Sequence, residues 1–136
     1  MRIRMARRIS LVGIALLLAT GPAWGHHALI AQFDVSKSIT LRGTLTKMQW
    51  VNPHGWIYLD VKRPDGQVEN WAIETGSPLR MEKRGLKKSD FQFGMELIVG
   101  GFAAKDATLT AAGWIITFPN REASFPALEA SFPLGR

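Results

Sequence analysis

The chain contains no cysteine among its 136 residues. Disulfides, thiol catalysis, thiolate metal sites and iron–sulfur clusters are therefore excluded, and folding must rely on buried apolar surface and backbone pairing. The sequence also lacks the G-x-S-x-G, H-E-x-x-H, phosphate-loop and dinucleotide-binding motifs. These absences argue against a hydrolase or a nucleotide enzyme, and we expect a protein that is not an enzyme.

Long apolar runs are scarce. The one from Ile9 to Ala19 has 11 residues, short of the roughly 20 that a membrane-spanning helix needs. It follows four arginines within the first eight residues and precedes Gly21-Pro22, which is the layout of a secretory signal peptide. The Arg7-Arg8 pair also fits a twin-arginine signal, but Ser10 stands where that signal usually carries a large apolar residue, so the ordinary export route is favoured.

The cleavage site of this signal can be read from two small residues. Signal peptidases need small side chains one and three residues before the cut, and Gly25 and Ala23 occupy those positions. We expect cleavage after Gly25, which leaves His26 as the first residue of a periplasmic or secreted protein without a stable membrane anchor. The remaining 111 residues (136 − 25) suit a single domain.

The net charge also excludes one class of partner. The whole chain carries +6, but four of its 17 basic residues lie in the predicted signal peptide, which leaves 13 basic against 11 acidic residues. A net charge of +2 (13 − 11) is too small for the electrostatic footprint of a nucleic-acid-binding domain. We therefore expect no nucleic-acid partner.

Hydrophobic alternation predicts a mainly β domain. The apolar positions of the first strand change phase near Thr46-Lys47, which indicates a bulge or sharp bend, and Gly43 permits a close approach of backbone. The sequence around Ser77-Pro78, with Gly85 as a stop, predicts one short helix. Strands are expected at Ser38–Val51, Trp56–Lys62, Val68–Glu74, Met95–Ala103 and Thr108–Phe118.

This order, β-β-β-α-β-β, matches a small five-stranded OB-like barrel, with an open meander or a small sandwich as the alternative. The predicted organisation is a signal peptide over 1–25, an N-terminal arm over 26–37, the barrel over 38–118 and a tail over 119–136. In this tail Glu122-Ala123-Ser124-Phe125-Pro126 recurs as Glu129-Ala130-Ser131-Phe132-Pro133. Because its prolines disfavour a helix or a central strand, we expect a poorly ordered tail whose phenylalanines dock on the barrel, or a partner-binding peptide.

The three histidines are the candidate metal ligands. Export processing would give His26 a free α-amine beside its imidazole, His27 adds a second ring, and His54 follows the first strand. Nitrogen ligands of this kind suit Cu(II), with zinc and nickel as competitors, so copper is the first candidate. The alternative is a frayed, solvated terminus and a His54 that only caps its turn. Asp34 and Glu74 are candidate second-shell carboxylates that could orient a histidine.

Aromatic residues offer a second kind of site. Trp56 and Tyr58 alternate with apolar residues on the second strand, and Trp71 follows on the third. Barrels of this type often bind ligands over strands two and three, so these rings form a candidate ligand or partner face, for instance for an exported enzyme. The alternative is that they fill space in or near the core, where we also place Trp50 and Trp114.

Several short motifs lie between residues 26 and 118: His26-His27, Gln32-Phe33-Asp34, Gly43, Trp50-Val51-Asn52-Pro53-His54, Trp71 with Glu74, Ser77-Pro78, Arg84-Gly85 and Gly100-Gly101. With them the chain resembles a family of small exported proteins of unknown function, found mostly in proteobacteria, that share the post-signal His-His and the Asn-Pro-His turn. The resemblance implies a periplasmic OB-like barrel and carries over no activity. Pro119-Asn120 departs from the Asp-Gly turn expected there, so the resemblance does not fix where the last strand ends.

Overall fold

The computed structural model describes residues 29–121 and 123–126, and within 123–126 it describes only the side chain of Phe125. The chain divides into two compact units, Met1–Ala31 and Gln32–Arg136. Of the first unit, residues 29–31 are described, and they are helical. The predicted signal peptide and His26-His27 lie outside the described residues. Within the described ranges, no helix is long and apolar enough to cross a membrane.

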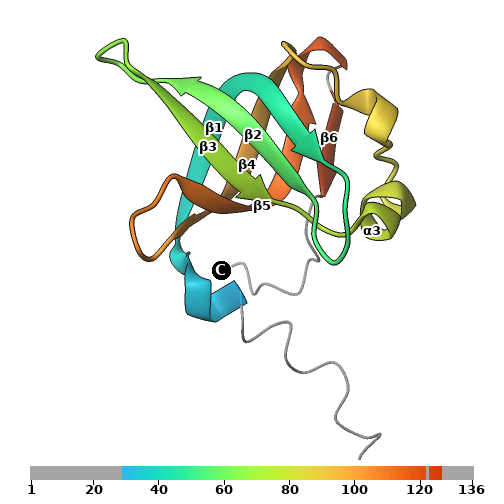
Figure 1. The fold of residues 1–136 in the computed structure, drawn as a ribbon, viewed down its shortest axis with the longest axis horizontal. Helices are drawn as coiled ribbons and strands as arrows, with labels where there is room; N and C mark the ends of the chain where they lie inside the picture. The colour runs from blue at the N-terminus through green and yellow to red at the C-terminus, as the bar shows by residue number, and fades with distance from the viewer. Residues whose placement is uncertain (1–28, 122, 127–136) are drawn as a thin grey trace, which may run out of the picture. The chain divides into compact units, whose positions relative to one another are not determined.

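The described part of the second unit is built on one sheet of six strands (Figure 1). Neighbouring strands follow the order β3-β2-β1-β4-β5-β6, and β3 also pairs with β5, so that β1 to β5 close into a ring. The predicted mainly β, OB-like fold is therefore confirmed. The strands are β1 (Phe33–Gln49), β2 (Trp56–Lys62), β3 (Val68–Glu74), β4 (Glu96–Ala104), β5 (Thr110–Phe118) and β6 (Ala123–Pro126).

Strand β1 is long because it pairs with two different strands along its length. Its first half pairs with β4 and its second half with β2, and Thr44 is the residue that pairs with both. The register with β2 shifts between Leu45 and Lys47, which confirms the bulge predicted from the change of phase. The strand begins at Phe33 instead of the predicted Ser38, since Phe33 pairs with Ala104 of β4. The register is irregular between Phe33 and Ser38, and the mostly polar residues of this stretch do not indicate a strand in the sequence.

The ring encloses an apolar core. On β2, Ile57 and Leu59 are fully buried, whereas Trp56 and Tyr58 on the opposite side are half-buried, which confirms the predicted alternation. Burial of such side chains is the main source of stability in a chain without disulfides. The core consists of Leu41, Leu45, Ile57, Leu59, Ile73, Met81, Leu86, Phe91, Leu97, Val99, Ala111, Ile116 and Phe118.

The two tryptophans assigned to the core differ. Trp50 is partly buried and packs against the core, with its ring centroid 6.0 Å from that of Phe91. Trp114 is half-buried and is not part of the core cluster. The register between β4 and β5 slips at Gly100 and Gly101, and Trp114 is the extra residue of that irregularity. Its assignment to the core was therefore wrong, because the slip cannot be read from alternation alone.

The predicted helix is confirmed as α3 (Pro78–Lys83), which places Met81 in the core. Ser77 is its N-cap by position but makes no side-chain capping hydrogen bond. Pro78 opens the helix, where a missing N–H costs nothing, and Gly85 ends it with a φ of +89°. A 3-10 turn, η1 (Lys88–Asp90), lies in the connector that follows.

The first part of the tail, which was predicted to be poorly ordered, forms a turn and a strand. A 3-10 turn, η2 (Pro119–Arg121), leads into β6, which pairs with Ile115 to Phe118 of β5. Phe125 packs against the core, as expected of a docking phenylalanine. The prolines do not prevent this short strand, because β6 is an edge strand and needs only one set of backbone partners. The rest of the tail, residues 127–136, lies outside the described residues.

Substitution of Gly43 tests the close approach between the backbones of β1 and β2. A Cβ atom at this position would lie 2.6 Å from the carbonyl oxygen of Asp60 in β2. We expect Gly43→Ala to lower the free energy of unfolding by about 1–3 kcal/mol, because the two backbones must move apart. Chemical denaturation measures this loss. The exposed Thr40→Ala on the same strand is the matched control, and equal stability of both variants would contradict the prediction.

Asp90 connects η1 to η2 through its contacts with Arg121. This connection predicts that the stability of the protein depends on pH. Arg121 donates hydrogen bonds to its carboxylate and to its backbone oxygen, at 3.0 and 3.1 Å. Burial acts to raise the pKa of Asp90, but hydrogen bonds from the Lys87 amide and from Arg121 hold the pKa below its usual value. A lowered folded pKa means that the stabilisation is complete above the unfolded pKa near 3.8 and is lost as the pH falls through the folded pKa.

We therefore expect Asp90→Asn to destabilise the protein at neutral pH by about 1 kcal/mol or less, because the ion pair is partly exposed to solvent. The difference from the wild type should shrink as the pH falls below about 4, where the wild-type carboxylate also becomes protonated. Thermal unfolding at a series of pH values measures it. A difference that does not depend on pH would show that the ion pair is not its cause.

Candidate functional site

The loop between β1 and β2 carries His54 and is fastened to the chain beyond β3. A cis peptide bond joins Asn52 to Pro53 immediately before His54. The amide of Gly55 donates to the carbonyl oxygen of Gly76 at 3.1 Å, and the amide of Thr75 donates to the carbonyl oxygen of Gly55 at 2.8 Å. Gly55 thus bonds to two successive residues beyond the last pair of the β2–β3 ladder, and these two hydrogen bonds fix the loop that follows β1.

Gly55 is required by the closeness of this contact. A Cβ atom there would lie 2.8 Å from the hydroxyl oxygen of Thr75, and Thr75 itself is fully buried and cannot turn away into solvent. Gly55, Thr75 and Gly76 were not among the site residues predicted from the sequence. The signal was present as a glycine after His54 and a Thr-Gly pair at the end of β3, but their meeting depends on the pairing of β2 with β3.

His54 and Glu74 meet at the end of this ladder. The Nδ1 atom of His54 contacts the Oε1 atom of Glu74 at hydrogen-bonding range. A carboxylate can only accept, so the ring donates its Nδ1–H to Glu74, and in the neutral ring the Nε2 atom keeps a free lone pair. The side chain of His54 is 44% exposed and that of Glu74 is 9% exposed, so the pair has one accessible end, at the imidazole.

Glu74 is buried because strands stand on both sides of it. Its partner across β2 is Trp56, and its partner across β5 is Ala112. Directly paired residues project on the same face of a sheet, which places the carboxylate between the indole and the alanine on the outer face. A buried carboxylate needs a hydrogen-bond donor to compensate for lost hydration, and His54 supplies one.

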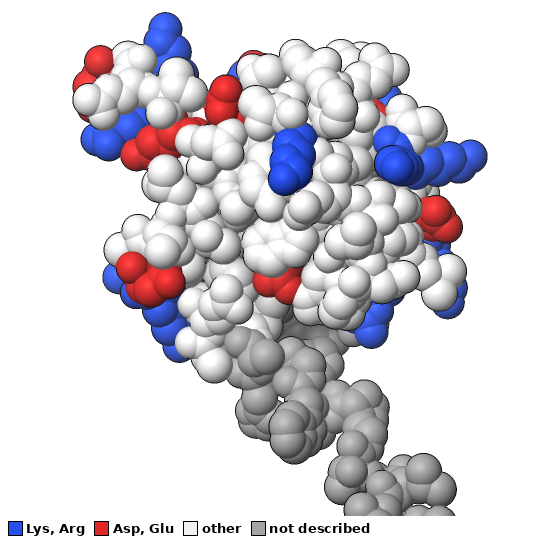
Figure 2. Space-filling view, viewed as in Figure 1, with Lys and Arg blue, Asp and Glu red and all other residues white. Residues whose placement is uncertain are grey.

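Trp56 and Tyr58 share that outer face, as predicted from their spacing. The hydroxyl of Tyr58 donates to the side-chain oxygen of Gln49 at 3.1 Å, and the ammonium nitrogen of Lys47 lies 4.9 Å from the centre of the Tyr58 ring. One side of the ring is thus covered by a cation. Figure 2 shows charges of both signs dispersed over one face of the molecule, without a large patch of one sign on that face.

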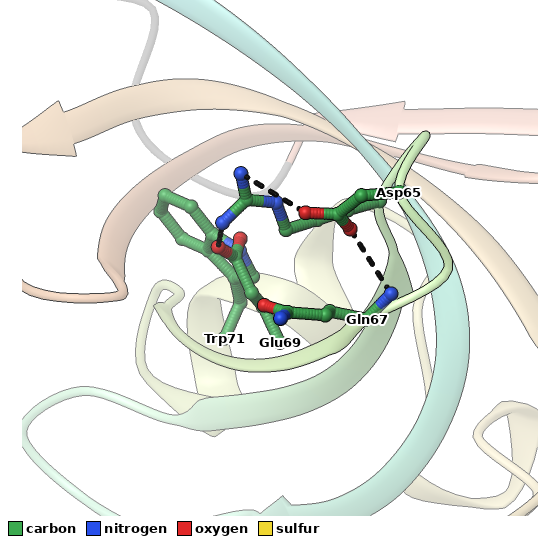
Figure 3. A network of polar contacts seen from close by, with 5 residues as sticks. Asp65, Gln67, Glu69 and Trp71 are labelled. Carbon is green, nitrogen blue, oxygen red and sulfur yellow. Dashed lines mark hydrogen bonds and ion pairs between the residues drawn. The ribbon is translucent and has the colours of Figure 1, made fainter.

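Trp71 does not join these two aromatic rings. It pairs with the buried Leu59, so it projects on the inner side of the sheet and packs against the core. Its indole N–H donates to Glu69 at 3.0 Å, and Glu69 also accepts from Arg63, in the network that continues to Asp65 and Gln67 in the β2–β3 turn (Figure 3). The single aromatic face of three residues is therefore corrected to Trp56 and Tyr58.

Asp34 is the other predicted second-shell carboxylate. It accepts hydrogen bonds from the hydroxyl and the amide of Ser36, which lower its pKa, and it forms an ion pair with Lys37 at 3.7 Å. Among the described residues its partners are these neighbours in the chain and not a histidine.

Two of the three predicted metal ligands, His26 and His27, lie outside the described residues. Within the described ranges, no group of three or more histidine, aspartate or glutamate side chains is placed so that it could hold a metal ion. The structure thus provides one oriented imidazole, at His54, and its role as a ligand stays a prediction.

Gly55 gives a direct test of how His54 is positioned. We expect Gly55→Ala to push the loop away from Thr75, to cost about 1–3 kcal/mol of stability and to break the contact between His54 and Glu74. The loss of the Nδ1–H hydrogen bond should be visible in the nitrogen NMR shifts of the His54 ring. Val51→Ala, in the same loop and 50% exposed, is the control and should leave those shifts unchanged. A Gly55→Ala protein with an unaltered His54 ring would contradict this description.

Comparison with known proteins gives one result. No curated protein and no solved structure matches this sequence. One family model matches residues 15–113, which is 99 of the 136 residues and covers the strands of the ring up to the middle of β5. The chain therefore belongs to this family, a family of unknown function designated DUF6152.

Proposed function

We propose that this protein binds a transition-metal ion in the periplasm, with His54 as a ligand and copper as the first candidate metal. The observation that carries the proposal is the contact between His54 and Glu74. Metal-binding histidines almost always donate their second ring N–H to a carboxylate, a carbonyl or water, which fixes the tautomer and raises the basicity of the ligating nitrogen. Here the carboxylate of Glu74 is buried, and the Nε2 atom belongs to the His54 side chain, which is partly exposed to solvent.

One imidazole is not sufficient for tight binding, so other ligands must complete the site. The mature N-terminus would supply an α-amine and the imidazoles of His26 and His27, if cleavage follows Gly25. Amine and imidazole nitrogens are ligands that Cu(II) prefers, with zinc and nickel as competitors. The proposed ligand set is therefore His26, His27 and His54, with Glu74 holding His54.

Titration of Cu(II) into the correctly cleaved protein tests the proposal. We expect binding of one equivalent, with an affinity that falls at least tenfold in His54→Ala and about ten- to a hundredfold in Glu74→Gln, because the amide cannot support the ring as the carboxylate does. Calorimetry gives the affinity and the stoichiometry. Tyr58→Phe is the matched control, since it changes a polar group on the same face without touching His54.

A second preparation with one extra residue before His26 tests the contribution of the terminus. The extra residue moves the α-amine away from the His26 ring, so the affinity should fall if the amine is a ligand. Equal and weak binding by all preparations, including His54→Ala, would disprove metal binding as the function. Two independent equivalents would show that the terminus and His54 do not share one ion.

The alternative is an interaction module that uses Trp56 and Tyr58, accessory to an exported protein. It is favoured by one observation, that both rings lie on the outer face of β2, where Trp56 pairs with Glu74 and Tyr58 with Ala72. Under this alternative, replacing the two rings abolishes capture of the partner, whereas His54→Ala has no effect on it. The copper titration of the Tyr58→Ala protein should then show an unchanged affinity, which would separate the two functions, since Tyr58 pairs with Ala72 and not with Glu74.

A further inference from the structure

The outer edge of β5 holds an extended segment from the tail. Strand β3 covers this edge at Thr110 to Ala112, and β6 covers it at Ile115 to Phe118. The ring of Phe125 packs edge-on against Phe118, with centroids 5.7 Å apart. It also lies against the end of α3, because a Cβ atom on Gly85 would be 3.5 Å from this ring.

This edge therefore recognises an extended segment in two ways. Backbone pairing to β5 provides affinity, and the place beside Phe118 and Gly85 selects an aromatic side chain at one position. The segment that occupies the edge, Ala123–Pro126, belongs to the first copy of the repeat, whose sequence runs over residues 122–126. The second copy, residues 129–133, has the identical sequence Glu-Ala-Ser-Phe-Pro seven residues later. Any property of the first copy that β5 recognises is present again in the second.

We infer that the edge of β5 between Ile115 and Phe118 is a docking site for either copy, and that residues 129–133 of the same chain are its second occupant. The two copies compete for the same edge of β5, so the tail contains two alternative segments that can cover this edge. An uncovered strand edge invites pairing with other chains, so a spare segment keeps the edge covered when the first copy detaches. Occupation by the same chain is favoured over another molecule because the tether gives a high effective concentration.

The length of the loop that connects β5 to each copy determines the relative occupancy of the two registers. The first copy follows η2 directly, whereas docking of the second requires a loop that is seven residues longer. Loop-closure probability falls roughly as the −3/2 power of loop length, which disfavours the second register about fivefold. Weakening the first copy should therefore transfer the edge to the second copy.

Disulfide trapping in the full chain tests this inference, and the absence of native cysteines makes it clean. Thr117 pairs with Ser124, so Thr117→Cys with Ser124→Cys reports the first register, and Thr117→Cys with Ser131→Cys reports the second. Both pairs should form disulfides within one molecule, the second about fivefold more slowly. Adding Phe125→Ala should accelerate the second disulfide, because that change removes the anchor of the competing copy.

Phe132→Ala is the matched control. Added to the Thr117–Ser131 cysteine pair, it should abolish the disulfide, since it removes the anchor of the second copy but leaves the tether unchanged. The inference is overturned if the second disulfide does not form, or if it forms equally well with Phe132→Ala, which would indicate random collision of a tethered thiol. Disulfides between two molecules would also overturn it, because the occupant would then be another chain. Thermal unfolding of each variant confirms that it is folded.

Discussion

The parallel pairing of β3 with β5 is the constraint on which the structure depends. It involves only Ala72, Ile73 and Glu74 on one side and Thr110 to Ala112 on the other, yet it converts an open sheet into a ring. Ala111 and Ala112, on the β5 side of this pairing, are both buried. Closure removes two strand edges and encloses the apolar core that must stabilise a chain without disulfides.

The same closure creates the candidate site. Glu74 is the last residue of the closing pair, and the strand partners on its two sides exclude water from it. Such a carboxylate is stabilised only if a donor reaches it, and the loop clamped by Gly55 brings His54 to that place. The closure thus determines the fold and the burial of the acid, and the loop held by Gly55 orients the imidazole towards that acid.

Local patterns in the sequence predicted much of this fold. The β2–β3 hairpin was predicted with its observed bounds because a clean alternation is interrupted by a Pro-Asp-Gly turn. Trp71 is two residues before the apolar Ile73, so the alternation along β3 already assigns it to the inner face and not to the face of Trp56 and Tyr58. The contact of His54 with Glu74 joins residues 20 apart through the pairing of β2 with β3, and Glu74 was predicted as one of two carboxylates that could orient a histidine. Strand β6 depends on an edge that exists only in the folded ring, so it cannot be read from local sequence.

The central claim is that Glu74 holds the His54 ring so that its Nε2 atom can bind a metal ion. Nitrogen-15 NMR of the histidine rings, recorded while diamagnetic Zn(II) is added to the processed protein, tests it most directly. We predict a large shift of the His54 Nε2 signal and a retained Nδ1–H hydrogen bond to Glu74. A His54 ring whose signals do not change, or whose Nδ1 atom binds the metal instead, would contradict the claim.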